Sequence, residues 1–432
     1  MNVAVLGLWH LGTVTAACLA SRDCDVTAID FDPAVVAGLS AGRPPVFEPG
    51  LEPLLAEGLA SGKLRVSSEP SAVANAAIVW VAYDTPVDDE DRADVAFVER
   101  AITRVFPFLA DGAVVLVSSQ MPVGTTRRLS HAFAAVAAGR RVGFAYSPEN
   151  LRLGKAIDVF LHPDRVVVGV ERDDDRRIIG QLLAPITDRI EWMGLESAEM
   201  VKHALNAFLA TSVTFINEVA AVAEQVGADA TDVERGLKSE ARIGPKAYLS
   251  PGGAFAGGTL ARDVMFLTGL GREHGVETHL LGAVKTSNDA HRGWAARRLT
   301  QCLGTLAGHT VAIWGLTYKP GTDTLRRSSA VELCRWLAAA GARVSAHDPA
   351  VTALPPDLSA IMHLASSPIE AVDGASALVV ATPWPDYRQV PVEALARMTR
   401  PLVLDANRFL QHTIGVAPGV EYLAVGVGGA HT

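Results

Sequence analysis

Short apolar runs alternate with longer segments of helical spacing through the first half of the chain. Asn2–Leu6 and Asp25–Ile29 are two such runs, and between them the apolar positions of residues 13–21 recur at the spacing of a helix. Runs of this length predict buried strands, and their alternation with helices predicts a parallel, doubly wound sheet. Such sheets bind ligands beyond the carboxyl ends of their strands. Further strands are predicted at residues 77–81, 113–117, 142–146 and 165–170.

The second half begins with a different pattern. Residues 197–226 contain no proline or glycine, and their apolar positions predict a long buried helix. Residues 284–303 predict a second long helix. A strand, a helix and a strand then predict another Rossmann-like unit, at residues 310–315, 330–340 and 343–346. The expected fold class is α/β, with two Rossmann-like doubly wound parallel-sheet domains (1–195 and 301–432) joined by a long-helix central domain (196–300).

The turn after the first strand carries a degenerate dinucleotide-binding fingerprint. Gly7 and Gly12 stand at its outer glycine positions, whereas Trp9 occupies the middle one. Glycines here permit a tight turn and helix packing, with the phosphates on the helix N-terminus. Asp30 ends the second strand, where a carboxylate accepts from a ribose 2′-hydroxyl and repels a 2′-phosphate, which favours NAD over NADP. The expected cofactor contacts here are Gly7, Trp9, Leu11, Gly12 and Asp30. The alternative is an ordinary turn with a solvated Asp30.

Composition narrows the class of protein. A net charge of −9 without a long basic run argues against a nucleic-acid-binding surface. No basic leader follows Met1 and no apolar run is long enough to span a bilayer, so a cytoplasmic location without membrane contact is expected. The cysteines have neither disulfide nor metal-ligand spacing, and no metal site is expected: Cys18, Cys24, Cys302 and Cys334.

A loop in the middle of the chain suggests a family. Arg242-Ile243-Gly244 is followed by Pro251-Gly252, Phe255, Gly257 and finally Asp263. This order resembles the active-site loop of the UDP-glucose/GDP-mannose dehydrogenase family, in which a nucleophilic cysteine precedes a Lys-Asp pair. Thr259 stands where that family has its cysteine. The resemblance implies substrate contacts at Arg242, Phe255 and Gly257 and catalytic positions at Thr259 and Asp263.

Three strand ends and the long helix are similar to other segments of that family. The resemblance implies that Glu149 is a catalytic glutamate and that Lys202 and Asn206, one turn apart on a helix face, stabilise an oxyanion. It also implies cofactor contacts at Thr85 and Gln120, where Gln120 replaces a threonine that helps hold an active-site water. Taken singly, Glu149 could neighbour a helix cap and Lys202 could be a solvated lysine.

The last third resembles the family's nucleotide-binding domain. Residues 315–329 and 382–387 match its motifs, which implies that Lys319 and Arg326 meet the sugar-nucleotide diphosphate and NAD. Ser329 stands where proline is common in the family.

The resemblance covers nearly the whole chain and implies NAD as cofactor, a nucleotide-sugar substrate and a homodimer formed through the long helix. The expected activity is NAD-dependent oxidation of a UDP-hexose at C6. An alkyl hydroxyl ionises far above a thiol, whose pKa is about 8.5, so Thr259 predicts that the reaction stops at a carbonyl or returns hydride as an epimerase would. Two alternatives stay open: complete oxidation to a uronic acid through the hydrated aldehyde, and a binding paralogue without turnover.

Overall fold

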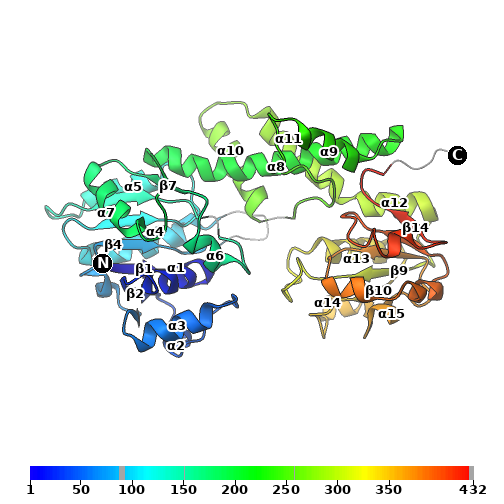
Figure 1. The fold of residues 1–432 in the computed structure, drawn as a ribbon, viewed down its shortest axis with the longest axis horizontal. Helices are drawn as coiled ribbons and strands as arrows, with labels where there is room; N and C mark the ends of the chain where they lie inside the picture. Colours follow the sequence, from blue (N-terminus) through cyan, green and yellow to red (C-terminus); the bar gives the residue numbers. More distant parts are fainter. Residues whose placement is uncertain (87–92, 150, 257, 428–432) are drawn as a thin grey trace. The chain divides into compact units, whose positions relative to one another are not determined.

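The computed structural model of the chain describes residues 1–86, 93–149, 151–256 and 258–427. The chain divides into two compact units, Met1–Leu205 and Asn206–Thr432. Each unit is built on one sheet covered by helices, as Figure 1 shows, so the predicted α/β class with two Rossmann-like sheets is confirmed.

The first unit holds an eight-stranded sheet in the order β3-β2-β1-β4-β5-β6-β7-β8. The strand order reverses beside β1, which pairs in parallel with β2 on one side and β4 on the other. The carboxyl ends of β1 and β4 therefore form the switch point where such folds bind dinucleotides. The strands are β1 (Asn2–Leu6), β2 (Asp25–Ile29), β3 (Leu64–Ser67), β4 (Ile78–Val81), β5 (Val114–Val117), β6 (Gly143–Tyr146), β7 (Val166–Gly169) and β8 (Ile190–Met193).

One pairing departs from the parallel arrangement expected from sequence. β6 and β7 pair antiparallel through Tyr146 and Gly169, because their connection re-enters the sheet at the edge where β6 ends. Within its described residues that connection holds one short helix, α6 (Ala156–Leu161). The segment that follows Glu149 therefore stays near the carboxyl edge of β6.

Alternate residues of β1 enter two separate cores. Val3 and Val5 pack with α1, α3 and α7 on one face, and Ala4 and Leu6 pack with α4 and α5 on the other. Burial on both faces explains why the strands are continuous apolar runs without a polar alternation. The helices are α1 (His10–Ala20), α2 (Pro33–Ser40), α3 (Leu51–Ala60), α4 (Val95–Val105), α5 (Thr125–Ala134) and α7 (Asp173–Leu183), with short 3₁₀ turns η1 (Pro70–Val73) and η2 (Phe106–Phe108).

The helix α8 (Leu195–Val226) is 32 residues long, close to the range predicted from sequence. Contrary to the sequence-based expectation, it is the one helix within the described residues that is long and apolar enough to cross a membrane by length and composition. However, it buries Glu199, His203 and Asn217, which is typical of a core helix with polar contacts. The boundary between the two units falls inside α8.

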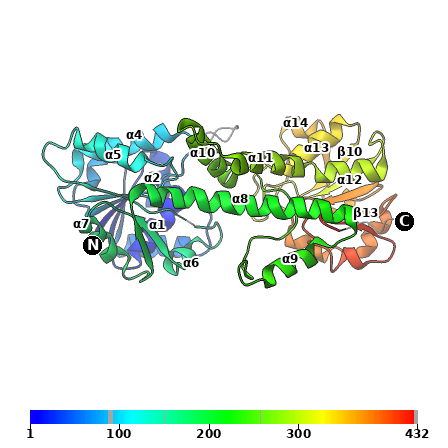
Figure 2. The same ribbon diagram turned by 90° about the horizontal axis from the view of Figure 1, so that it is seen from above.

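In the second unit, helices pack beside the C-terminal part of α8. Figures 1 and 2 show α10 (Thr259–Glu273) and α11 (His279–Arg292) beside α8. Ala207 and Ala210 of α8 belong to one buried apolar cluster with Val264 of α10 and Val284 of α11. The single helix predicted over 284–303 is wrong. It is broken at Gly293, a residue type that weakens helix interiors, and α12 (Trp294–Leu303) begins anew.

The second sheet is six-stranded, parallel throughout, and ordered β11-β10-β9-β12-β13-β14. Its switch point lies beside β9, between β10 and β12. The strands are β9 (Thr310–Trp314), β10 (Arg343–His347), β11 (Met362–Leu364), β12 (Ala377–Val380), β13 (Leu402–Leu404) and β14 (Glu421–Leu423). The remaining helices are α9 (Ala230–Ser239), α13 (Ser329–Ala339), α14 (Pro356–Ser359) and α15 (Pro368–Ala371), with η3 (Pro385–Gln389), η4 (Val392–Arg397) and η5 (Ile414–Val416).

Candidate active site

The turn from β1 to α1 has no room for side chains at its two outer glycines. A Cβ on Gly12 would lie 1.7 Å from the carbonyl oxygen of Gly7. A Cβ on Gly7, whose φ is +94°, would lie 2.6 Å from the ring of Tyr83. Glycine is therefore needed at both positions for β1, α1 and β4 to approach one another at the switch point. A close approach of this kind leaves room for a pyrophosphate at the N-terminus of α1.

Asp30 lies directly beside this turn. One carboxylate oxygen accepts the backbone N–H of Leu8 at 2.7 Å, and the other accepts that of Asp32 at 3.0 Å. A carboxylate has about four acceptor positions, so capacity remains for a ribose hydroxyl. Trp9 is the N-cap residue of α1 and is 50% exposed, whereas Leu11 is buried. The residues of this turn fit the pyrophosphate and ribose of NAD.

The next two strand ends are joined to each other. Thr85, after β4, donates its hydroxyl to the backbone oxygen of Gln120, after β5, at 2.6 Å. The loop after β5 is held by α8: Glu199 accepts the N–H and hydroxyl of Thr126, and the Nε2 of His203 lies 2.9 Å from the oxygen of Met121. The buried carboxylate and imidazole of α8 thus fix the loop that carries Gln120.

Glu149 and Lys202 come together in the first unit. The ammonium of Lys202 donates to the backbone oxygen of Glu149 at 2.6 Å, and Oε1 of Glu149 is buried without a hydrogen-bond partner among the described residues. Burial raises the pKa of the Glu149 carboxyl to about 7, with Lys202 opposing the rise and Asp84 adding to it. A carboxyl with such a pKa beside an ammonium is suited to proton transfer near neutral pH.

In the second unit Asn206 and Asp263 form a buried pair. The amide of Asn206, on α8, donates to the carboxylate of Asp263, which is fully buried one turn into α10. Thr259 is the first residue of α10 and is exposed. Helix α10 therefore presents the Thr259 hydroxyl at its N-terminus while its next turn is fixed by Asn206.

The loop before α10 is held by amide side chains. Asn288 both donates to and accepts from the backbone of Phe255, at 2.9 and 3.0 Å, and Asn217 accepts the N–H of Gly252 at 3.0 Å. Arg242 is 88% exposed at its side chain and pairs with Glu240. Gly257 lies outside the described residues. Asn288 was not among the residues singled out from sequence, because a single buried asparagine has no recognisable spacing.

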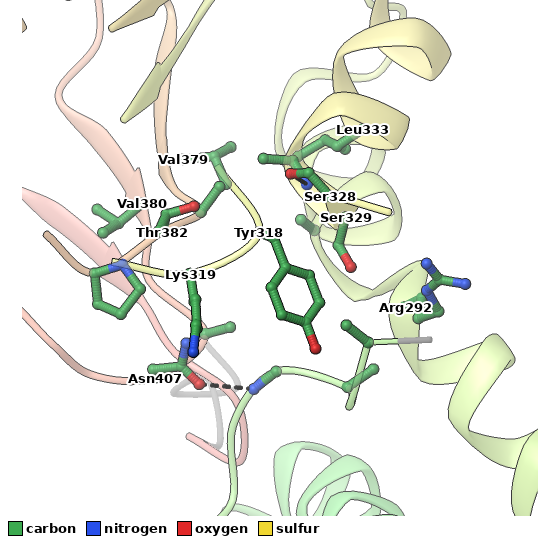
Figure 3. A pocket seen from close by; sticks show the side chains of 18 of the residues that line it. Arg292, Tyr318, Lys319, Ser328, Ser329, Leu333, Val379, Val380, Thr382 and Asn407 are labelled. Carbon is green, nitrogen blue, oxygen red and sulfur yellow. Dashed lines mark hydrogen bonds between the residues drawn. The ribbon is translucent and has the colours of Figure 1, made fainter. Parts of the chain in front are cut away.

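A cavity of about 450 Å³ opens at the switch point of the second sheet. It is lined by residues after β9, after β12, on α11 and α13, and in the loop at 253–256. In Figure 3 the ring of Tyr318 projects into it, with Lys319 and Asn407 on one side and Ser329 and Arg292 on the other. Lys319 has no ion pair among the described residues, whereas Arg292 pairs with Glu332 at 2.8 Å. Lys319 is thus the cation best placed for an anionic ligand, and the exposed Arg326 is not part of the lining.

The second switch point repeats the glycine geometry of the first, and its carboxylate accepts more hydrogen bonds than Asp30 does. Gly315 has φ +92°, and a Cβ there would lie 2.4 Å from Thr382. Asp348 uses one oxygen for the N–H groups of Leu316 and Thr317, the Thr317 hydroxyl and the indole of Trp384. The other oxygen of Asp348 accepts the N–H of Ala350 at 2.9 Å, so Asp348 has fewer free acceptor positions for a ribose than Asp30 has.

The first Rossmann unit has a carboxylate, Asp30, with free acceptor positions at a strand end. The second has a cavity with Lys319 in its lining. Together they define an NAD-dependent dehydrogenase with a second nucleotide site. The described ranges contain no group of three or more His, Cys, Asp or Glu side chains arranged to hold a metal ion.

Comparison with known proteins identifies the family. Three family models match the chain: the NAD binding domain of the UDP-glucose/GDP-mannose dehydrogenase family over residues 1–187, its central domain over 196–290 and its UDP binding domain over 312–412. The chain belongs to this family. It is an NAD-dependent nucleotide-sugar dehydrogenase, as expected from sequence.

Individual relatives agree over the full length. A UDP-glucose 6-dehydrogenase of Pseudomonas aeruginosa is 34% identical over 99% of this chain and 97% of its own. A UDP-glucose 6-dehydrogenase of Bacillus subtilis is 32% identical over 99% of this chain and 98% of its own. Among solved structures, a UDP-glucose dehydrogenase of Pyrobaculum islandicum covers 99% of this chain and 98% of its own with a TM-score of 0.85 and 31% identity.

Proposed function

We propose that the protein oxidises an alcohol of a UDP-hexose, at C6, by two electrons and stops at the carbonyl. The observation that carries this proposal is the pairing of Glu149 with Lys202 in one unit while Thr259, not cysteine, begins α10 in the other. The groups for the first oxidation are present. The thiolate for the second is missing at the position where the family's pattern has it.

The contacts described above support a chemical role for each of these residues. Glu149, in its carboxylate form, takes the hydroxyl proton of the substrate, either directly or through water. Lys202 stabilises the negative charge that develops on the substrate oxygen, which in a water-poor site lowers the barrier by several kcal/mol. Asn206, oriented by Asp263 and four residues from Lys202 on α8, donates to the same oxygen. NAD, which the turn after β1 and Asp30 would hold, would supply the hydride acceptor.

The products balance. One alcohol and one NAD⁺ give one carbonyl, one NADH and one proton, which passes to Glu149. A second oxidation of an aldehyde requires addition of a nucleophile to its carbon first. The hydroxyl of Thr259 is a poor nucleophile because its pKa lies many units above that of a thiol and no described base contacts it.

The remaining roles that we propose concern binding. Lys319 binds the diphosphate in the cavity of the second unit, with Phe255 and Gly257 near the sugar and Arg242 as a further substrate contact. Asp30 binds the adenosine ribose, Gly7, Trp9, Leu11 and Gly12 surround the pyrophosphate, and Thr85, Gln120 and Arg326 contact the cofactor. In domain terms, we assign NAD to residues 1–195, the catalytic loop and dimer helix to 196–300 and the nucleotide sugar to 301–432.

A second candidate is the complete oxidation to a uronic acid through the hydrated aldehyde. The names of the relatives favour it, since the P. aeruginosa and B. subtilis proteins are UDP-glucose 6-dehydrogenases. A redox-neutral epimerisation and binding without turnover are the remaining outcomes of the test.

Purified protein is incubated with NAD and UDP-, GDP-, CDP- and dTDP-hexoses in turn, with a hydroxylamine present to trap carbonyls. The expected result is one NADH and one oxime per UDP-sugar consumed, measured by absorbance and mass spectrometry. Two NADH with a carboxylate would contradict the proposal in favour of the complete oxidation. A changed sugar without net NADH would indicate epimerisation.

We also propose a homodimer formed through α8. Phe208, Phe215, Val222 and Val226 are 67%, 49%, 62% and 70% exposed, and their spacing places them along one stripe of the helix. We propose that the same stripe of a second copy of the chain packs against these residues. A Phe215→Arg variant is expected to weaken the dimer at least about 100-fold, because it buries an unpaired charge at the interface.

Light scattering after size exclusion measures the mass of both proteins. The matched control is Val276→Arg, which places the same charge at a 59% exposed valine off α8. A wild-type monomer, or a Phe215→Arg dimer as stable as the control, would refute the α8 interface.

A further inference from the structure

The loop at residues 47–50 buries a carboxylate that none of the roles above uses. The side chain of Glu48 is only 1% exposed. A buried carboxylate is costly unless every acceptor position finds a donor, so its partners show what the loop holds in place.

Glu48 has partners from two other parts of the first unit. Nε2 of His10 donates to Oε2 of Glu48 at 2.9 Å, and the N–H of Gly154 donates to the same oxygen at 2.8 Å. The N–H of Ala156 donates to Oε1 at 2.9 Å. Burial by itself would raise the pKa of Glu48, but these hydrogen bonds outweigh it and hold the pKa below its usual value. Glu48 is therefore a charged acceptor shared by His10 and the 154–156 backbone.

His10 belongs to the cofactor turn. It is the first residue of α1, directly after Trp9, and its side chain is 17% exposed. The pyrophosphate of NAD binds at the N-terminus of this helix. A cofactor bound at this turn would therefore lie close to the residue whose imidazole donates to Glu48.

Gly154 and Ala156 belong to the segment that follows Glu149. Ala156 begins α6, and Lys202 holds the other end of the segment at the backbone oxygen of Glu149. The side chain of Ile157 lies 3.6 Å from the position of a Cβ on Gly50, so the same loop also packs against α6. The backbone beyond Glu149 is thus fixed at one end by Lys202 and at the other by Glu48.

We propose that Glu48 and His10 are positioning residues that couple NAD binding to the order of the 151–161 segment and so to the placement of Glu149. The cofactor fixes the α1 turn, His10 fixes Glu48, and Glu48 fixes the N–H groups of Gly154 and Ala156. The coupling is reciprocal, because a segment that is already ordered lowers the entropic cost of ordering its neighbour. The effect of this coupling on catalysis rests on the proposed function of Glu149. The coupling itself can be measured with NAD alone, without a sugar substrate.

Hydrogen–deuterium exchange of peptides covering 151–161 tests the coupling with NAD alone, in the full-length protein. In the wild type, saturating NAD is expected to slow exchange of these amides at least about fivefold. Glu48→Gln, which cannot accept from all three donors, is expected to lose this protection and to bind NAD about tenfold more weakly by calorimetry. Glu52→Gln, at an exposed position in α3, is the matched control and should behave as the wild type.

A pair of His10 variants separates positioning from folding. His10→Gln keeps an N–H donor near the place of Nε2 and should retain the protection, whereas His10→Phe removes the donor and should lose it. The proposal is overturned if NAD protects 151–161 equally in wild type and His10→Phe, or if both His10 variants behave alike. Because no sugar is added, failure of the proposed oxidation would leave this test unaffected.

Discussion

Replacing Glu149 with glutamine is expected to lower kcat for alcohol oxidation by about 10²–10⁴-fold, the usual contribution of a positioned general base. In the wild type, kcat/KM should rise as pH increases through about 7, because burial raises the pKa of Glu149 to about 7 and only the carboxylate accepts a proton. The variant should lose this rise. Initial rates of NADH formation across neutral pH measure both effects.

Asp84→Asn is the matched control. The charge of Asp84 raises the pKa of Glu149, so its removal should move the rise in kcat/KM to lower pH without abolishing activity. If Glu149→Gln keeps the wild-type profile, Glu149 is not the base.

Although Glu149→Gln should lower activity, it should increase the stability of the fold. In the folded protein the pKa of Glu149 is raised from the ordinary 4.5 to about 7. The stability contributed by its neutral carboxyl is therefore fully present below pH 4.5 and is lost as pH rises through about 7. At a higher pH Glu149→Gln should therefore raise the free energy of unfolding, by at most about 3 kcal/mol. An unchanged melting temperature in mildly alkaline buffer would contradict the buried state of this carboxyl.

Replacing Thr259 with cysteine is expected to change the product from a carbonyl to a carboxylate. A thiolate adds to the aldehyde carbon, the adduct loses hydride to a second NAD⁺, and water releases the acid from the thioester. The cysteine would stand at the N-terminus of α10, where the helix dipole lowers the pKa of a thiol. NADH per sugar should therefore rise from one to two, as measured by absorbance with mass spectrometry of the product.

Thr259→Ser is the control, because it keeps a hydroxyl and should still give one NADH. The Gln120→Thr change, added to Thr259→Cys, tests whether thioester hydrolysis also needs the family's water-binding threonine. A covalent enzyme–substrate adduct that accumulates in the single variant and is released in the double variant would support that division of roles. A wild type that already forms two NADH would refute the requirement for a thiol.

The sequence was sufficient for the order of elements and for the class of chemistry, because both depend on local patterns. Fully buried strands such as Val114–Val117 are continuous apolar runs, which can be recognised in the sequence. The surroundings of Gly7 and Gly12 leave no space for a side chain, so the glycines of this turn can be recognised in the same way. The same applies to the continuous apolar spacing of α8. The break at Gly293 was missed because a single glycine in a helical pattern is often tolerated.

Only the tertiary structure decided which polar groups are buried together. Whether Glu149 was a solvated residue or a carboxyl with a raised pKa depended on the packing around it and on Lys202, far away in sequence. Glu48 shares its carboxylate with His10 and with Gly154, contacts that join residues distant along the chain. Hydrophobic patterns repeat at fixed local periods, whereas a hydrogen bond between remote residues leaves no such period. For that reason the chain by itself determined the fold and family of this dehydrogenase, and tertiary packing decided the protonation and connections of its polar groups.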